Sequence, residues 1–374
     1  MPAAPSSSSN PSRNRPGVYP VSICVLDPGL RPGNRIEGGS SEPPFFLSAK
    51  WATTGAMRLT QPFLKLPLRF DAETLEREVR ALPATAWVPH ATGFPGNEAV
   101  RLVTVMGQPT DEFEGPMRPT EHLARCPYIM EVMAALGGVW GRSRLMGLGV
   151  GAEVPEHVDV HYHWRTHLRI HVPVITNPEV EFTCGGETVH MAPGECWVFD
   201  SFRWHEVHNR GPERRVHLVL DTVVTLPLWD LIDSAKAGSA DSPMLRPGQA
   251  DPRNLRFEQV NAPSIMSPWE VRGHLAFVAE SVVPHPQLEA VMKRLDRFAD
   301  GWAALWAQYG TSDQGVGEYQ RLLAETRMEV ERLGSAKISL ANEIQLNTVL
   351  DQLIFVVAVA RQSLVSAGGQ RLAG

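Results

Sequence analysis

Three residues in the middle of the chain have the types and the spacing of a metal centre. His157 and Asp159 lie two positions apart in HVD, and on an extended backbone side chains at this spacing project to the same side. His205 follows in FDSFRWHEV, far enough along the chain for intervening strands to cross a sheet and return. Two imidazoles and one carboxylate on one octahedral face leave three positions open, an arrangement that selects non-haem Fe(II) for oxygen chemistry.

Two further segments have the alternation of strands with one apolar face. In HLRIHVPVI, Arg169 and His171 share a face opposite leucine, isoleucine and valine. In RRVHLVLD, Arg215 and His217 share a face in the same way. An arginine inside a β-structure requires an anion, because an unpaired buried guanidinium costs several kcal/mol. A dicarboxylate cosubstrate would supply that anion, and the planar fork of arginine suits bidentate binding of a carboxylate.

The composition limits the class of partner. The chain has 374 residues and a formal net charge of −6 without a block of basic residues, which argues against nucleic acid and an anionic membrane surface as partners. We expect a small-molecule or peptide substrate instead. The four cysteines (Cys24, Cys126, Cys184 and Cys196) show no CxxC spacing, and this usage indicates reduced thiols in a cytoplasmic protein.

The chain divides into three parts by composition. Residues 1–56 are rich in Pro, Ser and Gly and predict a disordered tail without a signal-peptide core. Residues 57–228 carry the strand patterns and the candidate metal ligands. Residues 229–374 have helical patterns. We therefore expect a tail, a β-domain and a C-terminal helical region, in that order.

Within the β-domain, two helices precede a run of strands. The first is expected to begin after Asp71 and to end at Pro83, and the second to run from Pro127 to a stop at Gly137. Segments 101–106 and 143–150 are strand candidates, and turn dipeptides separate short runs of strand length beyond them. Short strands at close intervals, many with one apolar face, indicate a mainly β fold of the sandwich or jelly-roll type.

The C-terminal region predicts three or four amphipathic helices. Ser267, Pro268 and Glu270 form a capping box before the first of them. Apolar stripes of helical period continue through 271–282, 288–305 and 346–357, and the apolar run at 354–360 is too short to span a bilayer. This region is expected to brace the β-domain, to contribute to a substrate lid, or to form a homo-oligomer interface.

The order and spacing of these motifs resemble a known family. PEHVD, LRIHVPV and GECWVFDSFRWHEVHNRGPERRVHLVLD are similar to segments of the aspartyl/asparaginyl β-hydroxylase family of Fe(II)- and 2-oxoglutarate-dependent dioxygenases, nearest to the bacterial branch that includes free-proline cis-hydroxylases. An arginine and a histidine lie 12 and 14 residues after His157, and an arginine lies 10 residues after His205. The resemblance covers about residues 60–225 and is dense only from 145 to 222.

The resemblance implies a double-stranded β-helix, the jelly-roll fold of cupins, with flanking helices and a C-terminal α-helical unit. It implies His157, Asp159 and His205 as iron ligands and Arg215 as the partner of the distal carboxylate of 2-oxoglutarate. Arg169 and His171 would line the cosubstrate pocket. Some family members lack the carboxylate ligand, so the presence of Asp159 moves this chain toward the small-molecule branch without excluding a peptide substrate.

The expected function is hydroxylation of an unactivated C–H bond of an amino acid, free or in a peptide or other small molecule. Fe(II), 2-oxoglutarate and O2 are the expected cofactor and cosubstrates, with release of succinate and CO2, and no further catalytic side chain is nominated. Loops at 162–165 and 202–204 are the candidates for substrate contacts.

Three alternatives remain at this point. A cupin-like metal protein would explain HYH at 161–163, although His167 and Leu168 stand where the cupin glutamate is needed. A structural zinc site could use Cys184 and Cys196, which lack paired spacing. A catalytically silent binding or scaffold protein could retain the same fold.

Overall fold

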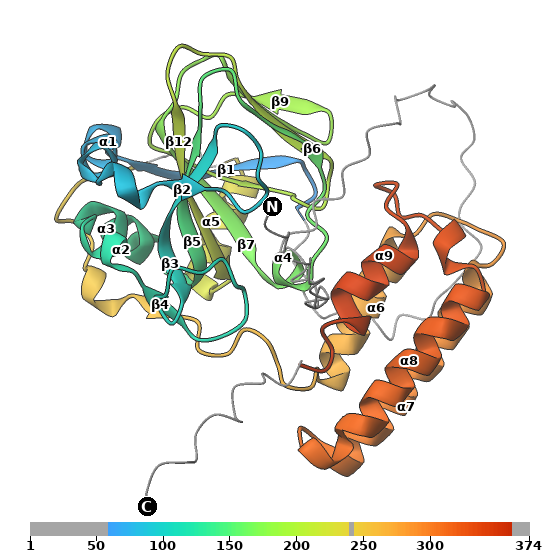
Figure 1. Ribbon diagram of the computed structural model, residues 1–374. Helices are drawn as coiled ribbons and strands as arrows, with labels where there is room; N and C mark the ends of the chain where they lie inside the picture. The colour runs from blue at the N-terminus through green and yellow to red at the C-terminus, as the bar shows by residue number, and fades with distance from the viewer. Residues whose placement is uncertain (1–58, 239–242, 361–374) are drawn as a thin grey trace, which may run out of the picture.

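The computed structural model describes residues 59–238 and 243–360 of the chain. Figure 1 shows two parts side by side, a β-rich unit formed by the first part of the chain and a helical unit formed by α6 to α9. The expected tail at residues 1–56 lies outside the described residues. The mainly β fold with flanking helices and a C-terminal helical region is confirmed.

The larger sheet has ten strands and provides one wall of the β-unit. Its central strands are antiparallel neighbours in the order β1, β10, β7, β12, β5 and β3. Its strands are β1 (Phe63–Phe70), β2 (Val88–Pro89), β3 (Asn97–Val105), β4 (Met117–Pro119), β5 (Val139–Leu148), β7 (Leu168–Ile175), β10 (Glu195–Phe199), β12 (Arg215–Val223), β13 (Met244–Leu245) and β14 (Arg256–Phe257).

The smaller sheet has four strands in the order β6, β11, β8 and β9. Its strands are β6 (Glu153–His157), β8 (Val180–Cys184), β9 (Glu187–Val189) and β11 (His205–Asn209). From β6 to β12 the chain crosses repeatedly between the two sheets, with β8 and β9 as consecutive strands of the smaller one, as in a jelly roll. A buried cluster that includes Phe199 of β10, Phe182 of β8 and Val207 of β11 joins the two inner faces.

Four helices cover the outside of the larger sheet: α1 (Ala72–Ala81), α2 (Glu121–Ala124), α3 (Pro127–Leu136) and α5 (Leu226–Lys236). The expected caps are present. The Asp71 carboxylate accepts from the Thr74 amide at 3.0 Å, and Gly137 ends α3 with a left-handed φ of 67°. The capping residues in the sequence were therefore sufficient to predict where both helices lie.

The connection between the units packs with the β-unit. Leu228 and Ile232 of α5 are fully buried in its main core, and β13 and β14 add parallel strands to its larger sheet. This packing leads us to propose that the helical unit begins near Ile265 and not at residue 229.

The helical unit contains α6 (Pro268–Ser281), α7 (Leu288–Tyr309), α8 (Val316–Arg332) and α9 (Leu346–Leu350). The Ser267 hydroxyl caps α6 by accepting from the Glu270 amide, as expected. The stripe at 346–357 does not form one α-helix, because a π-helical turn (Asp351–Phe355) follows α9 directly. Trp302 and Tyr319, with ring centroids 4.6 Å apart, lie fully buried in a core of this unit's own.

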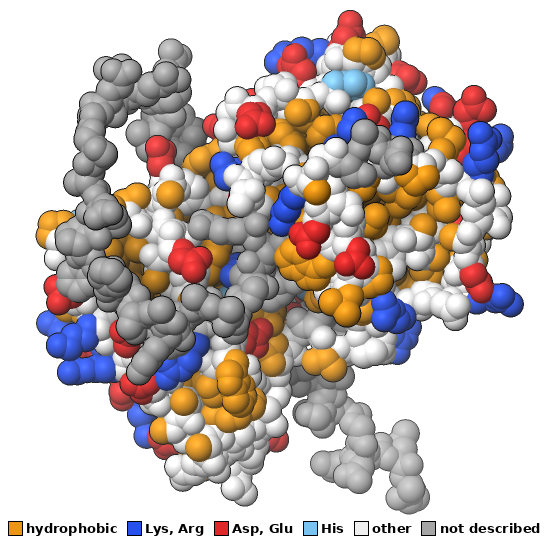
Figure 2. All heavy atoms as spheres, turned by 180° about the vertical axis from the view of Figure 1, so that it is seen from behind, with side chains coloured by type: hydrophobic (Ala, Val, Ile, Leu, Met, Phe, Trp, Pro, Cys, Tyr) orange, Lys and Arg blue, Asp and Glu red, His pale blue; other side chains and the backbone are white. Residues whose placement is uncertain are grey.

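Three observations concern the character of the molecule. No helix within 59–238 or 243–360 is long and apolar enough to cross a membrane. On the face shown in Figure 2, acidic and basic side chains are interspersed with hydrophobic ones. Cys126, Cys184 and Cys196 are buried free thiols, as expected for those three, while Cys24 lies outside the described residues.

Candidate metal centre

His157, Asp159 and His205 meet at the end of the smaller sheet. His157 is the last residue of β6 and pairs directly with His205, the first residue of β11. Asp159 follows β6 by two residues, and its amide donates to the Ser201 carbonyl at 3.0 Å. All three side chains are buried, and one potential ligand atom from each lies within 4.8 Å of the others. The structure thus brings the three sequence-predicted residues to one point.

Backbone carbonyls orient both imidazoles. Nδ1 of His157 lies 2.7 Å from the Pro155 carbonyl, and Nδ1 of His205 lies 2.8 Å from the Arg203 carbonyl. A carbonyl only accepts, so each Nδ1 carries the proton and each Nε2 keeps its lone pair. Burial, and then the nearby His157, lowers the pKa of His205 to about 3, so this ring is neutral at pH 7. Such a donor set fits a divalent transition metal.

The residues between the ligands pack on the helical unit. Val158 and Val160 alternate with the ligand side chains and are fully buried in the core shared with α6 to α9. The HVDV segment therefore presents its polar face to the metal site and its apolar face to the C-terminal helices, which is what strand-like alternation dictates.

The loop that leads to His205 is also tied to the helical unit. The Trp204 indole N–H donates to the Asn342 carbonyl, and the Asn342 side-chain amide donates to the Phe202 carbonyl, both at 2.8 Å. The Phe202 ring meets the edge of Phe277 from α6, with centroids 4.8 Å apart. These contacts are the kind expected of a helical region that braces the β-domain.

A pocket between the two sheets, which we call the inner pocket, extends from the three residues toward Arg215. His157, Asp159, His171, His205 and Arg215 all line it. Nη2 of Arg215 donates to Nδ1 of His217 at 2.6 Å, while Nε of Arg215 and Nε2 of His171 are buried without a hydrogen bond among the described residues. A buried guanidinium with an unused donor suits a carboxylate.

Arg169 also lines the inner pocket, but carboxylates of the chain already engage it. Its Nε donates to Asp221 at 2.9 Å and its Nη1 to Asp159 at 3.2 Å. The guanidinium carbon lies 3.8 Å from the centre of the Trp164 ring. Arg169 therefore connects a candidate metal ligand to a fully buried aspartate of β12, which sequence reasoning did not single out.

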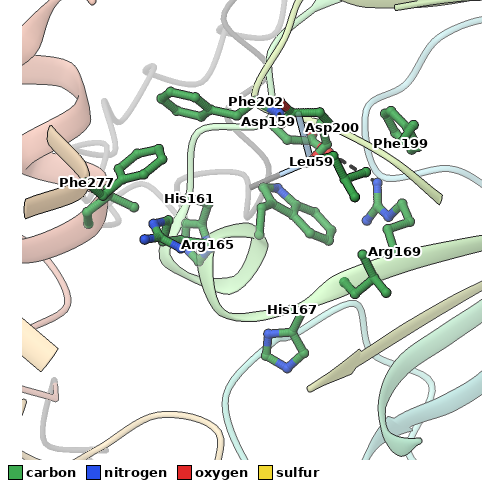
Figure 3. Close-up of a pocket in the computed structure, with 14 residues that line it drawn as sticks. Leu59, Asp159, His161, Arg165, His167, Arg169, Phe199, Asp200, Phe202 and Phe277 are labelled. Carbon is green, nitrogen blue, oxygen red and sulfur yellow. Dashed lines mark hydrogen bonds and ion pairs between the residues drawn. The ribbon is translucent and has the colours of Figure 1, made fainter. Parts of the chain in front are cut away.

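A second pocket, the outer pocket, shares Asp159 and Arg169 with the inner pocket (Figure 3). Arg165 of the short helix α4 (Tyr162–Thr166), Phe202 and Phe277 line it, so both units contribute. Figure 3 shows Asp159 and Arg169 pointing toward each other at its rim. The two segments expected to contact substrate, 162–165 and 202–204, contribute Trp164, Arg165 and Phe202 to this pocket.

Sequence reasoning missed two arginines on β5. Arg142 and Arg144 line the inner pocket and are only 3% and 4% exposed. Nη1 of Arg144 lies 2.9 Å from Nε2 of His90, and burial, aided by Arg144, lowers the pKa of His90 to about 2. The signal was present, because arginines two positions apart in an otherwise apolar strand share one face.

The other histidines near the site have protein partners. His163 contacts Asp221 at 3.3 Å, and His167 contacts Glu258 at 2.5 Å. Among the described residues, His157, Asp159 and His205 form the one group placed to hold a metal ion, and neither Cys184 nor Cys196 joins such a group.

Part of the chain is similar to a known protein family. Residues 112–224 match the family model described as aspartyl/asparaginyl beta-hydroxylase. A comparison with curated proteins gives no match.

Three solved structures illustrate the low similarity of this chain to known folds. One is an oxidoreductase of the 2OG-Fe(II) oxygenase family from Burkholderia pseudomallei (13% identity, 41% of this chain and 77% of that chain, TM-score 0.30). Another is a prolyl-4-hydroxylase from Pseudomonas putida (15% identity, 44% and 95%, TM-score 0.30). A predicted oxalate decarboxylase from Thermotoga maritima gives 21% identity, 23% and 68% coverage and a TM-score of 0.19.

Proposed function

We propose that this chain, whose residues 112–224 match the family model described as aspartyl/asparaginyl beta-hydroxylase, hydroxylates a C–H bond of an amino acid, free, in a peptide or in another small molecule. In this proposal His157, Asp159 and His205 hold Fe(II), and Arg215 receives the distal carboxylate of 2-oxoglutarate. The proposal that the chain lies nearest to the bacterial proline-hydroxylating branch rests on motif spacing alone.

One observation supports the proposal above the others. Two imidazoles that keep Nε2 free and one carboxylate converge at one end of a pocket that also holds a buried arginine with an unused N–H. A metal held by these ligands would bind the 2-oxo acid end of 2-oxoglutarate, and the arginine would bind the carboxylate at the other end. A structural metal site has no need of the arginine, and a site for a carboxylate alone has no need of the imidazoles.

When bound, Fe(II) would activate O2, which is the oxidant, and 2-oxoglutarate would supply two of the electrons that reduce it. One atom of O2 enters the substrate as a hydroxyl group and the other enters succinate, while C1 of 2-oxoglutarate leaves as CO2. The chain would position the substrate and cosubstrate and exclude water. The carbonyls of Pro155 and Arg203 hold the two imidazoles. The rings of Phe182 and Phe199, 4.9 Å apart, form an apolar wall of the inner pocket.

Arg215 and His171 would orient the cosubstrate. His217 fixes the Arg215 guanidinium by accepting from Nη2. Burial, and then the nearby Arg215, lowers the pKa of both His171 and His217. Both rings are therefore neutral at pH 7 and add no charge to the pocket, so the arginine is the cation that the dicarboxylate meets at this end.

The test is succinate release from anaerobically Fe(II)-loaded protein that is then given O2, 2-oxoglutarate and panels of amino acids and peptides. Substrate-dependent succinate in wild type, with less than 1% of it in His205→Ala, is the expected result. His208→Ala is the matched control, because His208 lies on the same strand but pairs with Glu153 and Glu206. Binding of Fe(II) and 2-oxoglutarate without any succinate would favour a silent binding protein.

Two accessory proposals accompany this function. The free thiols of Cys126, Cys184 and Cys196 support a cytoplasmic location. A homo-oligomer through the C-terminal helices is proposed from exposed apolar side chains such as Trp269 on α6 and Met328 on α8. Light scattering of wild type and Trp269→Ser checks the second proposal.

A further inference from the structure

We propose that the substrate is an anionic acid without a neighbouring ammonium group, and that Arg142 and Arg144 of β5 receive its carboxylate. This inference rests on the proposed function, since it assigns the part of the inner pocket that metal and cosubstrate leave free. An N-acylated amino acid and the C-terminal residue of a peptide both fit this description.

The position of the two arginines supports the proposal. Arg142 and Arg144 sit at alternate positions of β5 and line the same inner pocket as His157 and His205. Arg144 pairs in register with Val219 of β12, which also lines the pocket. Two guanidinium groups therefore face the space beside the metal centre, from a strand that supplies neither proposed metal ligands nor Arg215.

Neither guanidinium has an anionic partner in the described part of the chain. Arg144 donates to His90, whose ring is neutral, and forms no ion pair there. Arg142 donates from Nη1 to the Asp111 carbonyl at 3.2 Å, and its buried Nε makes no hydrogen bond to any described residue. The Phe113 ring centre lies 3.8 Å from its guanidinium carbon. Buried charges are normally paired, so this pair of cations indicates an anion from outside the chain.

The nearby carboxylates already have cationic partners. Asp111 forms a two-point pair with Arg101, at 2.6 and 3.1 Å. Asp159 and Asp221 both accept from Arg169. A substrate ammonium group would consequently find no free carboxylate among these residues. The site is arranged to receive an acid and not a zwitterion.

The charge balance of the inner pocket leads to the same result. Its lining includes four arginines, Arg142, Arg144, Arg169 and Arg215, and one carboxylate, Asp159. Fe(II) and the 2-oxoglutarate dianion cancel each other, so their binding leaves this excess of positive charge in place. Asp221 behind Arg169 compensates one cation. The remaining two charges are those of Arg142 and Arg144, and the carboxylate of a monoanionic substrate would neutralise one of them.

Three matched series of compounds test the proposal on wild-type protein loaded with Fe(II) and 2-oxoglutarate. They are N-acetyl amino acids, the same compounds as carboxamides, and the free amino acids. We expect the best N-acetyl amino acid to stimulate succinate release at least tenfold more than its carboxamide and its free form. Equal or greater stimulation by the carboxamide or the free form overturns the inference, and so does no response to the N-acetyl series. Failure to bind Fe(II) and 2-oxoglutarate refutes the proposed function instead.

Variants then locate the carboxylate. Arg144→Gln and Arg142→Gln are expected to raise the concentration of acid needed for half-maximal stimulation at least tenfold, while 2-oxoglutarate affinity stays within twofold and shows that the pocket is folded. Arg144→Lys should recover part of the loss. Arg214→Gln is the control, because Arg214 packs on Trp87 and pairs with Glu98 away from the pocket lining. A tenfold loss of 2-oxoglutarate affinity with unchanged response to the acid would assign these arginines to the cosubstrate and contradict the inference.

Discussion

His157 and His205 face each other across the antiparallel pair of β6 and β11, with ring centroids 4.2 Å apart. Strand register alone determines this relationship. A slip of one residue in either strand would turn one imidazole to the opposite face of the sheet. The geometry of the candidate metal centre is therefore a property of sheet pairing, and the contacts that hold β6 and β11 in register also hold the metal site.

Arg215→Lys should weaken binding of 2-oxoglutarate. Lysine keeps the charge but loses the planar fork, and a charge-assisted hydrogen bond is worth about 1.5 to 3 kcal/mol, or roughly a ten- to hundredfold change in affinity. Titration of 2-oxoglutarate into metal-loaded wild type and variant measures the change. An affinity equal to that of wild type would contradict the role assigned to Arg215.

Arg169→Lys should behave differently. Nη1 of Arg169 donates to Asp159, so the variant is expected to alter metal affinity as well as cosubstrate affinity. A Co(II) titration followed by visible absorption separates the two effects, because it needs no 2-oxoglutarate. Unchanged Co(II) affinity would show that the contact with Asp159 does not position the ligand.

Asn342→Ala should lower metal affinity from a distance. The variant removes the side-chain amide that donates to the Phe202 carbonyl in the loop that leads to His205. A hydrogen bond of this kind is worth about 0.5 to 1.5 kcal/mol, so roughly a two- to tenfold weaker Co(II) affinity is expected.

Asn347→Ala is the control for this experiment. Asn347 belongs to the same helical unit, but its side-chain oxygen makes no hydrogen bond among the described residues. Equal Co(II) affinities in Asn342→Ala, Asn347→Ala and wild type would show that the helical unit packs on the site without positioning it.

Acid should destabilise the protein through His274 of α6. Burial, and then the nearby Arg165, lowers the pKa of His274 from 6.5 to about 3. In the unfolded chain this histidine binds a proton below about pH 6.5, whereas in the folded protein it does so only below about pH 3. Stability therefore falls as pH decreases through this window. From pH 7 to 5 this histidine alone should cost about 2 kcal/mol of unfolding free energy.

Urea denaturation of metal-free wild type and His274→Gln at both pH values measures this contribution. The variant should lose about 2 kcal/mol less than wild type over the same interval. A decrease of the same size in both proteins would mean that His274 is not the titrating group.

Much of the site could be predicted from sequence because local rules act on it directly. The i, i+2 spacing of His157 and Asp159, and the alternation around Arg169 and Arg215, depend only on the two-residue period of a strand. The helix caps at Asp71 and Ser267 were visible for a similar reason, since capping is a contact between residues three apart.

The remainder depends on tertiary contacts that no local pattern contains. Segment 143–150 was expected to be a strand. Whether the side chains of Arg142 and Arg144 point into the pocket or away from it follows only from the pairing of β5 with β3 and β12. The bond between Asn342 and Phe202 joins residues more than a hundred positions apart. The π-helical turn after Leu350 interrupts a stripe whose period was otherwise regular.

The central claim is that His157, Asp159 and His205 hold Fe(II) in a site that 2-oxoglutarate completes as a chelating ligand. Anaerobic titration of Fe(II) and then 2-oxoglutarate, followed by the visible charge-transfer absorption of a 2-oxo acid bound to Fe(II), tests it most directly. We predict saturation at one equivalent of each in wild type and in His208→Ala, and no absorption in Asp159→Ala or His205→Ala. Folded wild-type protein without this absorption, or full absorption in the two ligand variants, would contradict the account.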